Sequence, residues 1–243
     1  MGRHGTIAGR KAAQDSKRAA MFTKYARAIT VAAKGGGDPE YNATLRLAIE
    51  KAKAISMPND NITRAIKKGT GELAGESYEE LTFEGYGLGG VAVIVEALTD
   101  NNNRTASSVR STFDKYGGNL GTPGCVSYMF SRKGIIIIDA EEVEIDEDAL
   151  LETALEAGAD DMVAHEDSFE IVTEPGVLAE VHDALVAAGY EIAESDVEYV
   201  PSMESAPTDP ADIAKLAKMI DILEDNDDVQ KVHTNCSIDL YEV

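Results

Sequence analysis

The sequence contains no tryptophan, only two cysteines and no uninterrupted apolar run near 18 residues. Cys125 and Cys236 lie far apart without Cys-x-x-Cys spacing, so we expect two reduced thiols rather than a disulfide or a metal site. A membrane span would need about 20 mostly apolar residues. The charged N-terminus also lacks the apolar segment of a secretory signal. We therefore expect a cytoplasmic protein with no membrane partner.

The familiar catalytic motifs are also absent. No HExxH, GxSxG or P-loop motif occurs, and the four histidines are scattered without metal-ligand spacing. Asp225-x-Asp227-Asp228 resembles the start of a calcium loop, but Gln230 and Cys236 stand where such a loop needs glycine and glutamate. A solvated acidic turn is the simpler interpretation. We expect no catalytic residue, metal, cofactor or small-molecule substrate, and thus no enzyme.

Two further segments allow alternative interpretations. Gly85-x-Gly87-x-x-Gly90 has the letters of a dinucleotide fingerprint, but it precedes the apolar strand Val91–Val95 instead of opening a helix, which favours a glycine turn. Asp100–Thr105 leads into a helix and contains Arg104, so free amides and one guanidinium could hold a phosphate. A plain turn capped by Asn103 or Thr105 is the alternative.

The charge is distributed very unevenly along the chain. The whole sequence has a formal net charge of −22, yet residues 1–70 carry fourteen Lys and Arg against five acids, a net of +9. Residues 71–133 have a net charge of −3, and residues 134–243 have a net charge of −28. Because salt screens charges beyond about 10 Å, the local charge matters more than the total. The N-terminal part is therefore the part suited to binding a polyanion.

The basic segment Arg3–Lys34 contains eight cations and one acid, Asp15. Spacings of three and four predict a helix from about Ala12 to Ala33, with a polar stripe that includes Lys17, Lys24, Arg27 and Lys34. A basic helical face is also a common solvated surface. The near absence of acid from this segment of an acidic protein favours phosphate binding, although no recognition helix aimed at base edges is evident.

The remaining pattern predicts an α+β fold in which an N-terminal three-helix domain precedes two ferredoxin-like α/β domains, one inserted in the other. Further helices are predicted from Asp38-Pro39 to Ile55 and over Asn61–Lys68. Strands are predicted over Val91–Val95, Cys125–Phe130 and Ser237–Leu240, among others. The expected domains are residues 1–76, residues 77–131 with 204–243, and residues 132–203. The tail is expected to return because two strands and one helix cannot close a core.

Several motifs closely resemble the YebC/PmpR family, whose mitochondrial relative is the translational activator of cytochrome c oxidase. They extend over nearly the whole chain and are Arg10–Asp15, Phe22–Lys24, Ile29–Lys34, Met57–Ile62, Arg64–Gly71, Tyr86-Gly87, Leu98–Asn101, Asn103–Thr105, Gly117–Gly121 and Val126–Phe130. Family members often begin with a longer arm containing Ser-Lys-Trp. This chain has Met1–Gly9 in that place, without the tryptophan.

The resemblance implies three domains and a non-enzymatic regulator of gene expression. Many members are described as probable DNA-binding transcriptional regulators, and others resemble translation factors that act on ribosomes stalled at proline-rich sequences. The expected partner is nucleic acid, either DNA or ribosomal RNA and tRNA, with the ribosome as the alternative. A module that docks a basic protein on the acidic domains is a second class of function. The candidate nucleic-acid-binding residues are Arg3, Arg10, Lys11, Lys17, Arg18, Lys24, Arg27, Lys34, Lys67, Lys68 and Arg104.

Overall fold

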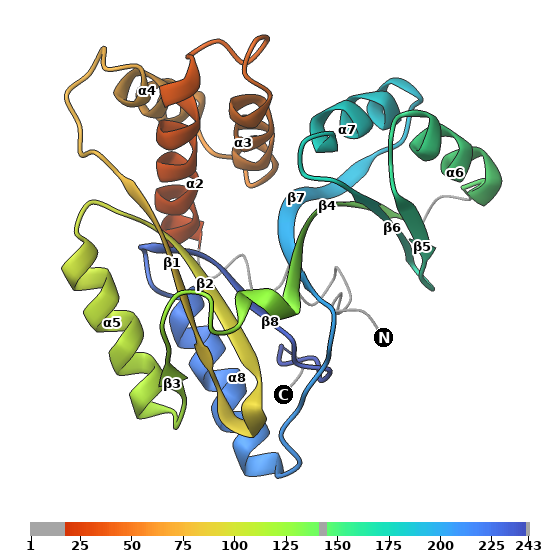
Figure 1. Ribbon diagram of the computed structural model, residues 1–243. Helices are drawn as coiled ribbons and strands as arrows, with labels where there is room; N and C mark the ends of the chain where they lie inside the picture. Colours follow the sequence, from red (N-terminus) through yellow and green to blue (C-terminus); the bar gives the residue numbers. More distant parts are fainter. Residues whose placement is uncertain (1–17, 141–144, 242–243) are drawn as a thin grey trace. The chain divides into compact units, whose positions relative to one another are not determined.

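The computed structural model describes residues 18–140 and 145–241 (Figure 1). Among these residues, the chain divides into two compact units. The first unit comprises the described residues up to Met129 and from Pro201 onward, and the second unit is Phe130–Val200. No described helix has the length and apolar character that a membrane span needs.

The first unit begins with a helical bundle of α2 (Arg18–Ala32), the short η1 (Ala33–Gly35), α3 (Ala43–Ala54) and α4 (Asn59–Gly69). Its core contains Ile29 of α2, Ile62 of α4 and, at helical spacing along α3, Leu45, Ile49 and Ala52. The prediction that the second helix starts at Asp38-Pro39 was wrong. Residues 39–41 form a turn, and the side chain of Asn42 accepts a hydrogen bond from the Leu45 amide and caps α3.

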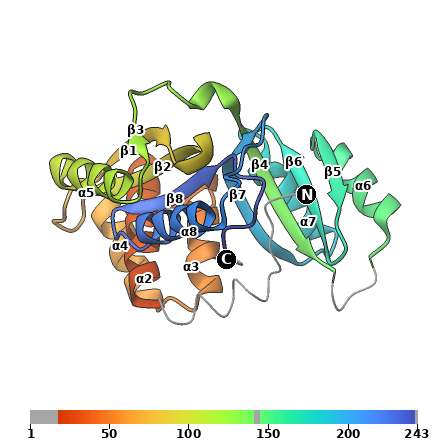
Figure 2. The same ribbon diagram turned by 90° about the horizontal axis from the view of Figure 1, so that it is seen from below.

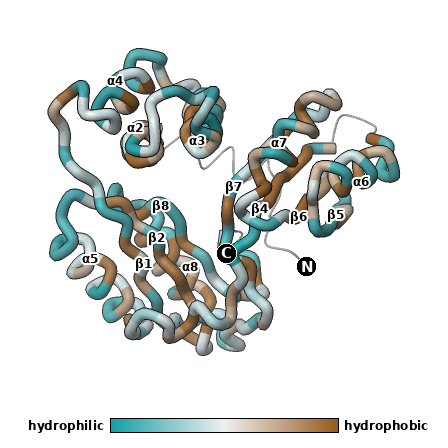
Figure 3. Tube along the Cα trace, turned by 45° about the horizontal axis from the view of Figure 1, so that its top comes forward, coloured by the Kyte–Doolittle hydropathy of each residue, from teal (hydrophilic) through white to brown (hydrophobic). Residues whose placement is uncertain are grey.

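The same unit contains a four-stranded antiparallel sheet. Its strands are β1 (Glu79–Tyr86), β2 (Ala92–Thr99), β3 (Asn119–Leu120) and β8 (Val229–Thr234), in the order β3-β1-β2-β8. Helices α5 (Asn102–Lys115) and α8 (Pro210–Glu224) lie side by side against one face (Figures 1 and 2). Val93, Val95, Phe113 and Leu216 belong to the core between them, and Figure 3 shows the hydrophobic stretch along β2.

Pairing of β8 with β2 brings the C-terminal segment back to complete this sheet. The second unit is therefore inserted into the first. The predicted fold class, with N-terminal helices, two α/β domains and one insertion, is confirmed by this arrangement.

Several strand predictions differ from the structure, including the short β3, which was not predicted. Cys125–Phe130 was predicted as a strand, but its chain turns through the short helix η3 (Ser127–Met129). The amides of Gly124, Val126 and Ser127 donate to the buried carboxylate of Glu84 over 2.8, 2.9 and 2.8 Å, which bends this apolar run into a loop. Strand β1, which carries Glu84, was not predicted, and Ser237–Leu240 is not a strand.

The glycine motif forms the connection between β1 and β2 and includes the short helix η2 (Leu88–Gly90). No helix that could present amides to a pyrophosphate follows it, because β2 begins directly after Val91. A Cβ on Gly87 would lie 2.5 Å from Cδ1 of Leu216, so a larger residue there would displace this side chain of α8. The Gly85–Gly90 motif is therefore a glycine-containing turn between two paired strands, as the sequence favoured.

The second unit contains β4 (Phe130–Asp139), α6 (Glu147–Glu156), β5 (Asp161–Ala164), β6 (Ser168–Thr173), α7 (Leu178–Ala187) and β7 (Ile192–Pro201). The sheet order β5-β6-β4-β7 and the βαββαβ sequence of elements are those of a ferredoxin-like fold. Ile136, Ile138, Leu150, Ile171 and Leu185 are almost completely buried in this unit.

Candidate nucleic-acid interface

The structure describes some of the candidate cations but not others. Arg3, Arg10, Lys11 and Lys17 lie outside the described residues, and Arg18 is described only as the first residue of α2. The side chains of the remaining candidates fall into two groups: those held by other parts of the first unit and those on its surface.

Two cations of α2, Lys24 and Arg27, and Lys34 of η1 are held by later residues of the first unit. Nζ of Lys24 donates to the carbonyl oxygen of Glu224, and Nζ of Lys34 donates to that of Tyr78 over 2.8 Å. Nη1 of Arg27 donates to the carbonyl oxygen of Leu98 over 3.1 Å. The polar stripe predicted for this helix therefore fastens the bundle to the sheet, at least through these three side chains.

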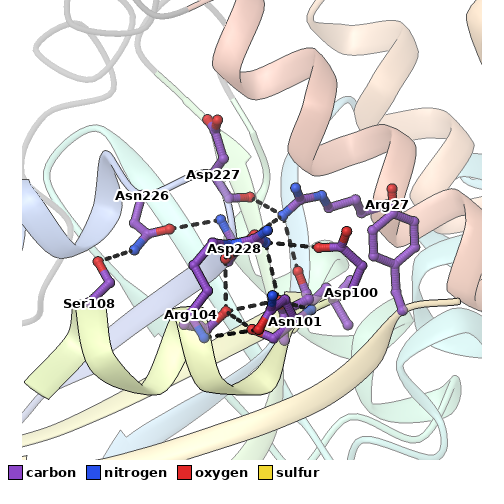
Figure 4. A network of polar contacts seen from close by, with 12 residues as sticks. Arg27, Asp100, Asn101, Arg104, Ser108, Asn226, Asp227 and Asp228 are labelled. Atoms are coloured by element: carbon purple, nitrogen blue, oxygen red, sulfur yellow. Dashed lines mark hydrogen bonds and ion pairs between the residues drawn. The ribbon is translucent and has the colours of Figure 1, made fainter. Parts of the chain in front are cut away.

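Arg27 and Arg104 meet at the carboxylate of Asp228, which precedes β8 (Figure 4). Nη1 of Arg27 lies 2.7 Å from Oδ1 of Asp228, and Nη2 of Arg104 lies 2.8 Å from the same oxygen. The hydroxyl of Thr105 donates to Oδ2 over 2.8 Å. Only 6% of the Asp228 side chain is exposed, so side chains of two helices, α2 and α5, converge on one buried acid.

Opposing effects act on the pKa of Asp228. Burial raises it, but hydrogen bonds from Thr105, Arg104 and Arg27 outweigh burial and hold the pKa below its usual value of 3.8. The carboxylate is therefore charged at neutral pH. The sequence marks the acidic turn that contains Asp228 but gives no sign that the last acid of this turn is buried between two arginines.

The turn before α5 is capped by Asn101, whose side chain accepts from the Arg104 amide over 3.0 Å, rather than by Asn103 or Thr105. Nη2 of Arg104 also lies 2.8 Å from Oδ1 of Asp100. Arg104 therefore neutralises carboxylates of its own chain. An ordinary capped turn describes Asp100–Thr105 better than a phosphate site.

An open pocket of about 340 Å³ adjoins this network. It is lined by two cations and four acids, together with a tyrosine and an asparagine: Arg27, Arg104, Glu76, Asp100, Asp227, Asp228, Tyr78 and Asn226. The excess of carboxylates disfavours a phosphate there. Within the described ranges, no group of three or more His, Cys, Asp or Glu side chains is arranged to hold a metal ion.

The second group of cations lies on the bundle surface. Arg64 and Lys67 are exposed on α4, on the side opposite the buried Ile62 and Ala65, and Lys53 is exposed on α3. Among the described residues, no hydrogen bond or ion pair engages the charged groups of these three side chains, which we call the outward cations.

Lys68 is half-buried, and its Nζ lies 3.9 Å from Oε2 of Glu76, at the limit of an ion pair. Lys67 is among the candidates predicted from the sequence, whereas Lys53 and Arg64 are not. The helical period of α4 could have found Arg64, because it lies three residues before Lys67 on the same exposed face.

Comparisons with known proteins match nearly the whole chain. Residues 3–72 match the family model of the TACO1/YebC protein N-terminal domain, and residues 78–236 match that of the TACO1/YebC second and third domain. A probable transcriptional regulatory protein of Clostridioides difficile is 54% identical over 98% of this chain and 100% of its own length. One from Geobacter sulfurreducens is 51% identical over 98% of this chain and 95% of its own.

The crystal structure of a conserved hypothetical protein from Aquifex aeolicus is similar as well. It has a TM-score of 0.83 and 48% sequence identity, over 92% of both chains. The family resemblance drawn from the motifs is thus confirmed across the bundle and both sheets. This chain belongs to the TACO1/YebC family, in which its relatives carry the name of probable transcriptional regulatory proteins.

Proposed function

We propose that this protein is a cytoplasmic, non-catalytic regulator of gene expression that binds nucleic acid, with DNA as its main target, through the phosphate backbone. The observation that carries the proposal is the group of outward cations, Lys53, Arg64 and Lys67, on a bundle whose sequence region has a net charge of +9. The names of the relatives as transcriptional regulators support it. Arg3, Arg10, Lys11, Lys17 and Arg18 would add to the same positive field.

Arg27 and Arg104 are not part of this proposed interface. Their guanidinium groups both pair with the buried carboxylate of Asp228, so a phosphate would compete with that carboxylate for them. Lys24 and Lys34 hold carbonyl oxygens and serve first to fasten α2. The interface is therefore centred on α3 and α4, with Lys67 and Lys68 at the end of α4.

The second unit has the opposite charge to the bundle. Residues 130–200 contain two Lys and Arg against twenty-one Asp and Glu, a net charge of −19. A polyanion repels such a unit, so the molecule would approach nucleic acid with its bundle first. Phosphate contacts of this kind position a protein without reading sequence.

The salt dependence of binding tests the proposal. Replacing both Arg64 and Lys67 with Ala should weaken binding to duplex DNA and flatten the plot of log K against log salt by about 0.9 for each lost phosphate contact. The matched control replaces Lys215 and Lys218 with Ala, two exposed lysines of α8 paired with acids of their own helix. If the Arg64 and Lys67 double variant and the Lys215 and Lys218 double variant gave equal slopes of log K against log salt, the proposal that α4 contacts phosphates would be rejected.

Phosphate binding alone does not separate DNA from ribosomal RNA. Sedimentation with ribosomes at near-physiological salt, with excess duplex DNA as competitor, separates these targets. Release from ribosomes by the duplex supports the DNA proposal. Retention on ribosomes under that competition would replace it with the ribosome-associated translation factor.

A further inference from the structure

The most exposed large hydrophobic side chain among the described residues is that of Tyr41. It is 88% exposed, compared with 72% for Tyr128 and 57% for Tyr241. Almost the whole ring therefore faces water, although aromatic rings gain from burial. The Tyr41 ring is not part of the hydrophobic core, so it does not stabilise the bundle by being buried.

The backbone that carries Tyr41 is firmly held. The Tyr41 amide donates to the carbonyl oxygen of Asp38 over 3.2 Å, and the next residue, Asn42, caps α3. Nδ2 of Asn42 also donates to the carbonyl oxygens of Ala32 and Gly36, both over 2.8 Å. The ring is thus presented from a fixed turn between α2 and α3, so little ordering of the backbone would oppose binding.

This turn lies at the same end of the bundle as the last turn of α4. A Cβ on Gly37 would lie 2.6 Å from Cγ2 of Thr70, so the α2–α3 connection packs against the end of α4. Figure 1 shows this connection and α4 together at one end of α2. The exposed Lys67 and the half-buried Lys68 belong to that last turn. One end of the bundle therefore combines an exposed aromatic ring with cationic side chains.

We propose that Tyr41 is a stacking platform for an unpaired base of a single-stranded polynucleotide, whose neighbouring phosphates are bound by the end of α4. This inference rests on the proposed function. It adds that the nucleic acid bound at this end of the bundle is single-stranded. An aromatic ring beside a positively charged track is the combination by which proteins hold single strands without reading sequence. A duplex offers no base face to such a ring, because its bases are stacked on one another.

The absence of tryptophan from the sequence allows a direct test. In a Tyr41→Trp variant of the full chain, the only indole reports on this position. Adding a single-stranded 20-mer should quench its fluorescence, and adding the same sequence as a duplex should not. The matched control is Tyr128→Trp, which places the indole at an exposed site outside the bundle. Equal quenching by single strand and duplex at position 41, or equal quenching at both positions, would overturn the inference.

Binding measurements complete the test. Tyr41→Ala should weaken binding of the labelled single strand by roughly tenfold and leave duplex binding unchanged, whereas Tyr41→Phe keeps the ring and should bind like the wild-type chain. Parallel arms with RNA and DNA of one sequence identify which single strand is preferred. If Tyr41→Ala and Tyr41→Phe bound the single strand with equal affinity, the proposed stacking role of Tyr41 would be rejected.

The failure of the inference can be told apart from failure of the proposed function. If the Arg64 and Lys67 double variant lost affinity while Tyr41→Ala did not, phosphate binding would stand and the stacking platform would be rejected. If the wild-type chain bound neither single strand nor duplex at low salt, both proposals would be rejected together.

Discussion

Nη1 of Arg27 lies 2.7 Å from Oδ1 of Asp228, and this contact joins residues 201 positions apart. It links α2 of the bundle to the turn before β8. Because Arg104 of α5 reaches the same carboxylate, one buried acid connects the bundle, the helix layer and the sheet of the first unit. Asp228 therefore contributes to holding the bundle in place within this unit, together with the backbone contacts of Lys24 and Lys34.

The first prediction concerns this acid. Asp228→Asn removes the charge that two guanidinium groups share, and it should lower the free energy of unfolding of the first unit by about 2–4 kcal/mol. Thermal unfolding followed by circular dichroism measures the change. Asp227→Asn is the matched control, because the side chain of Asp227 is exposed and only its carbonyl oxygen accepts from Arg27. A control variant as unstable as Asp228→Asn would contradict this account of the network.

The second prediction is a loss of stability in acid. The pKa values of Asp228 and Glu84 are both lower in the folded protein than their usual 3.8 and 4.5. For Glu84, burial raises the pKa, and hydrogen bonds from the Gly124, Val126 and Ser127 amides more than reverse the effect. A depressed carboxyl pKa stabilises the fold above the unfolded-state value, and this contribution is lost as the pH falls through the folded-state value.

The stability gap between the wild-type chain and Asp228→Asn should therefore be constant from pH 7 to about pH 5 and shrink below about pH 4. The Glu84→Gln variant should behave in the same way, with the gap starting to shrink at a slightly higher pH. Denaturant unfolding at a series of pH values measures both gaps. A gap that widened on acidification would show that the sign of these pKa shifts is wrong.

The third prediction concerns the packing of α4 on α2. A Cβ on Gly69 would lie 2.3 Å from the carbonyl oxygen of Thr30 and 2.6 Å from Cβ of Ala33. Gly69→Ala should therefore push the helices apart and destabilise the bundle by about 1–3 kcal/mol. Hydrogen exchange of the α2 amides measures the local effect. At Gly35, an added Cβ would meet only Nδ2 of Asn42 at 3.6 Å, so Gly35→Ala should leave α2 exchange unchanged.

The sequence predicted the parts of the fold that depend on local periodicity. Ile29 and Ala33 lie four residues apart, as do Leu45 and Ile49 in the next helix, and all four are buried in the bundle as helical spacing requires. The alternation of elements in Phe130–Val200 likewise identified a ferredoxin-like unit. The helical spacing lies within single helices, and the order of strands and helices involves only elements that follow one another in the sequence.

The parts that were missed depend on distant partners. Glu84 is buried in β1 because amides about 40 residues later satisfy its carboxylate, and no local pattern records such a partner. The same contact turns the apolar Cys125–Phe130 into a loop. Arg27 lies on the polar side of its helix, but a helical wheel cannot distinguish a side that faces water from one that faces Asp228.

The amide and the hydroxyl of Ser202 both donate to the carbonyl oxygen of Met129, over 2.8 and 2.9 Å. The chain therefore leaves the first unit and re-enters it at neighbouring points. Met129 on the outgoing segment and Ser202 on the returning segment hold these points together through the two hydrogen bonds. An insertion whose two ends meet in this way can lengthen, shorten or change its charge over generations while the register of its host sheet stays the same. The inserted acidic unit and the basic bundle can therefore change independently of one another.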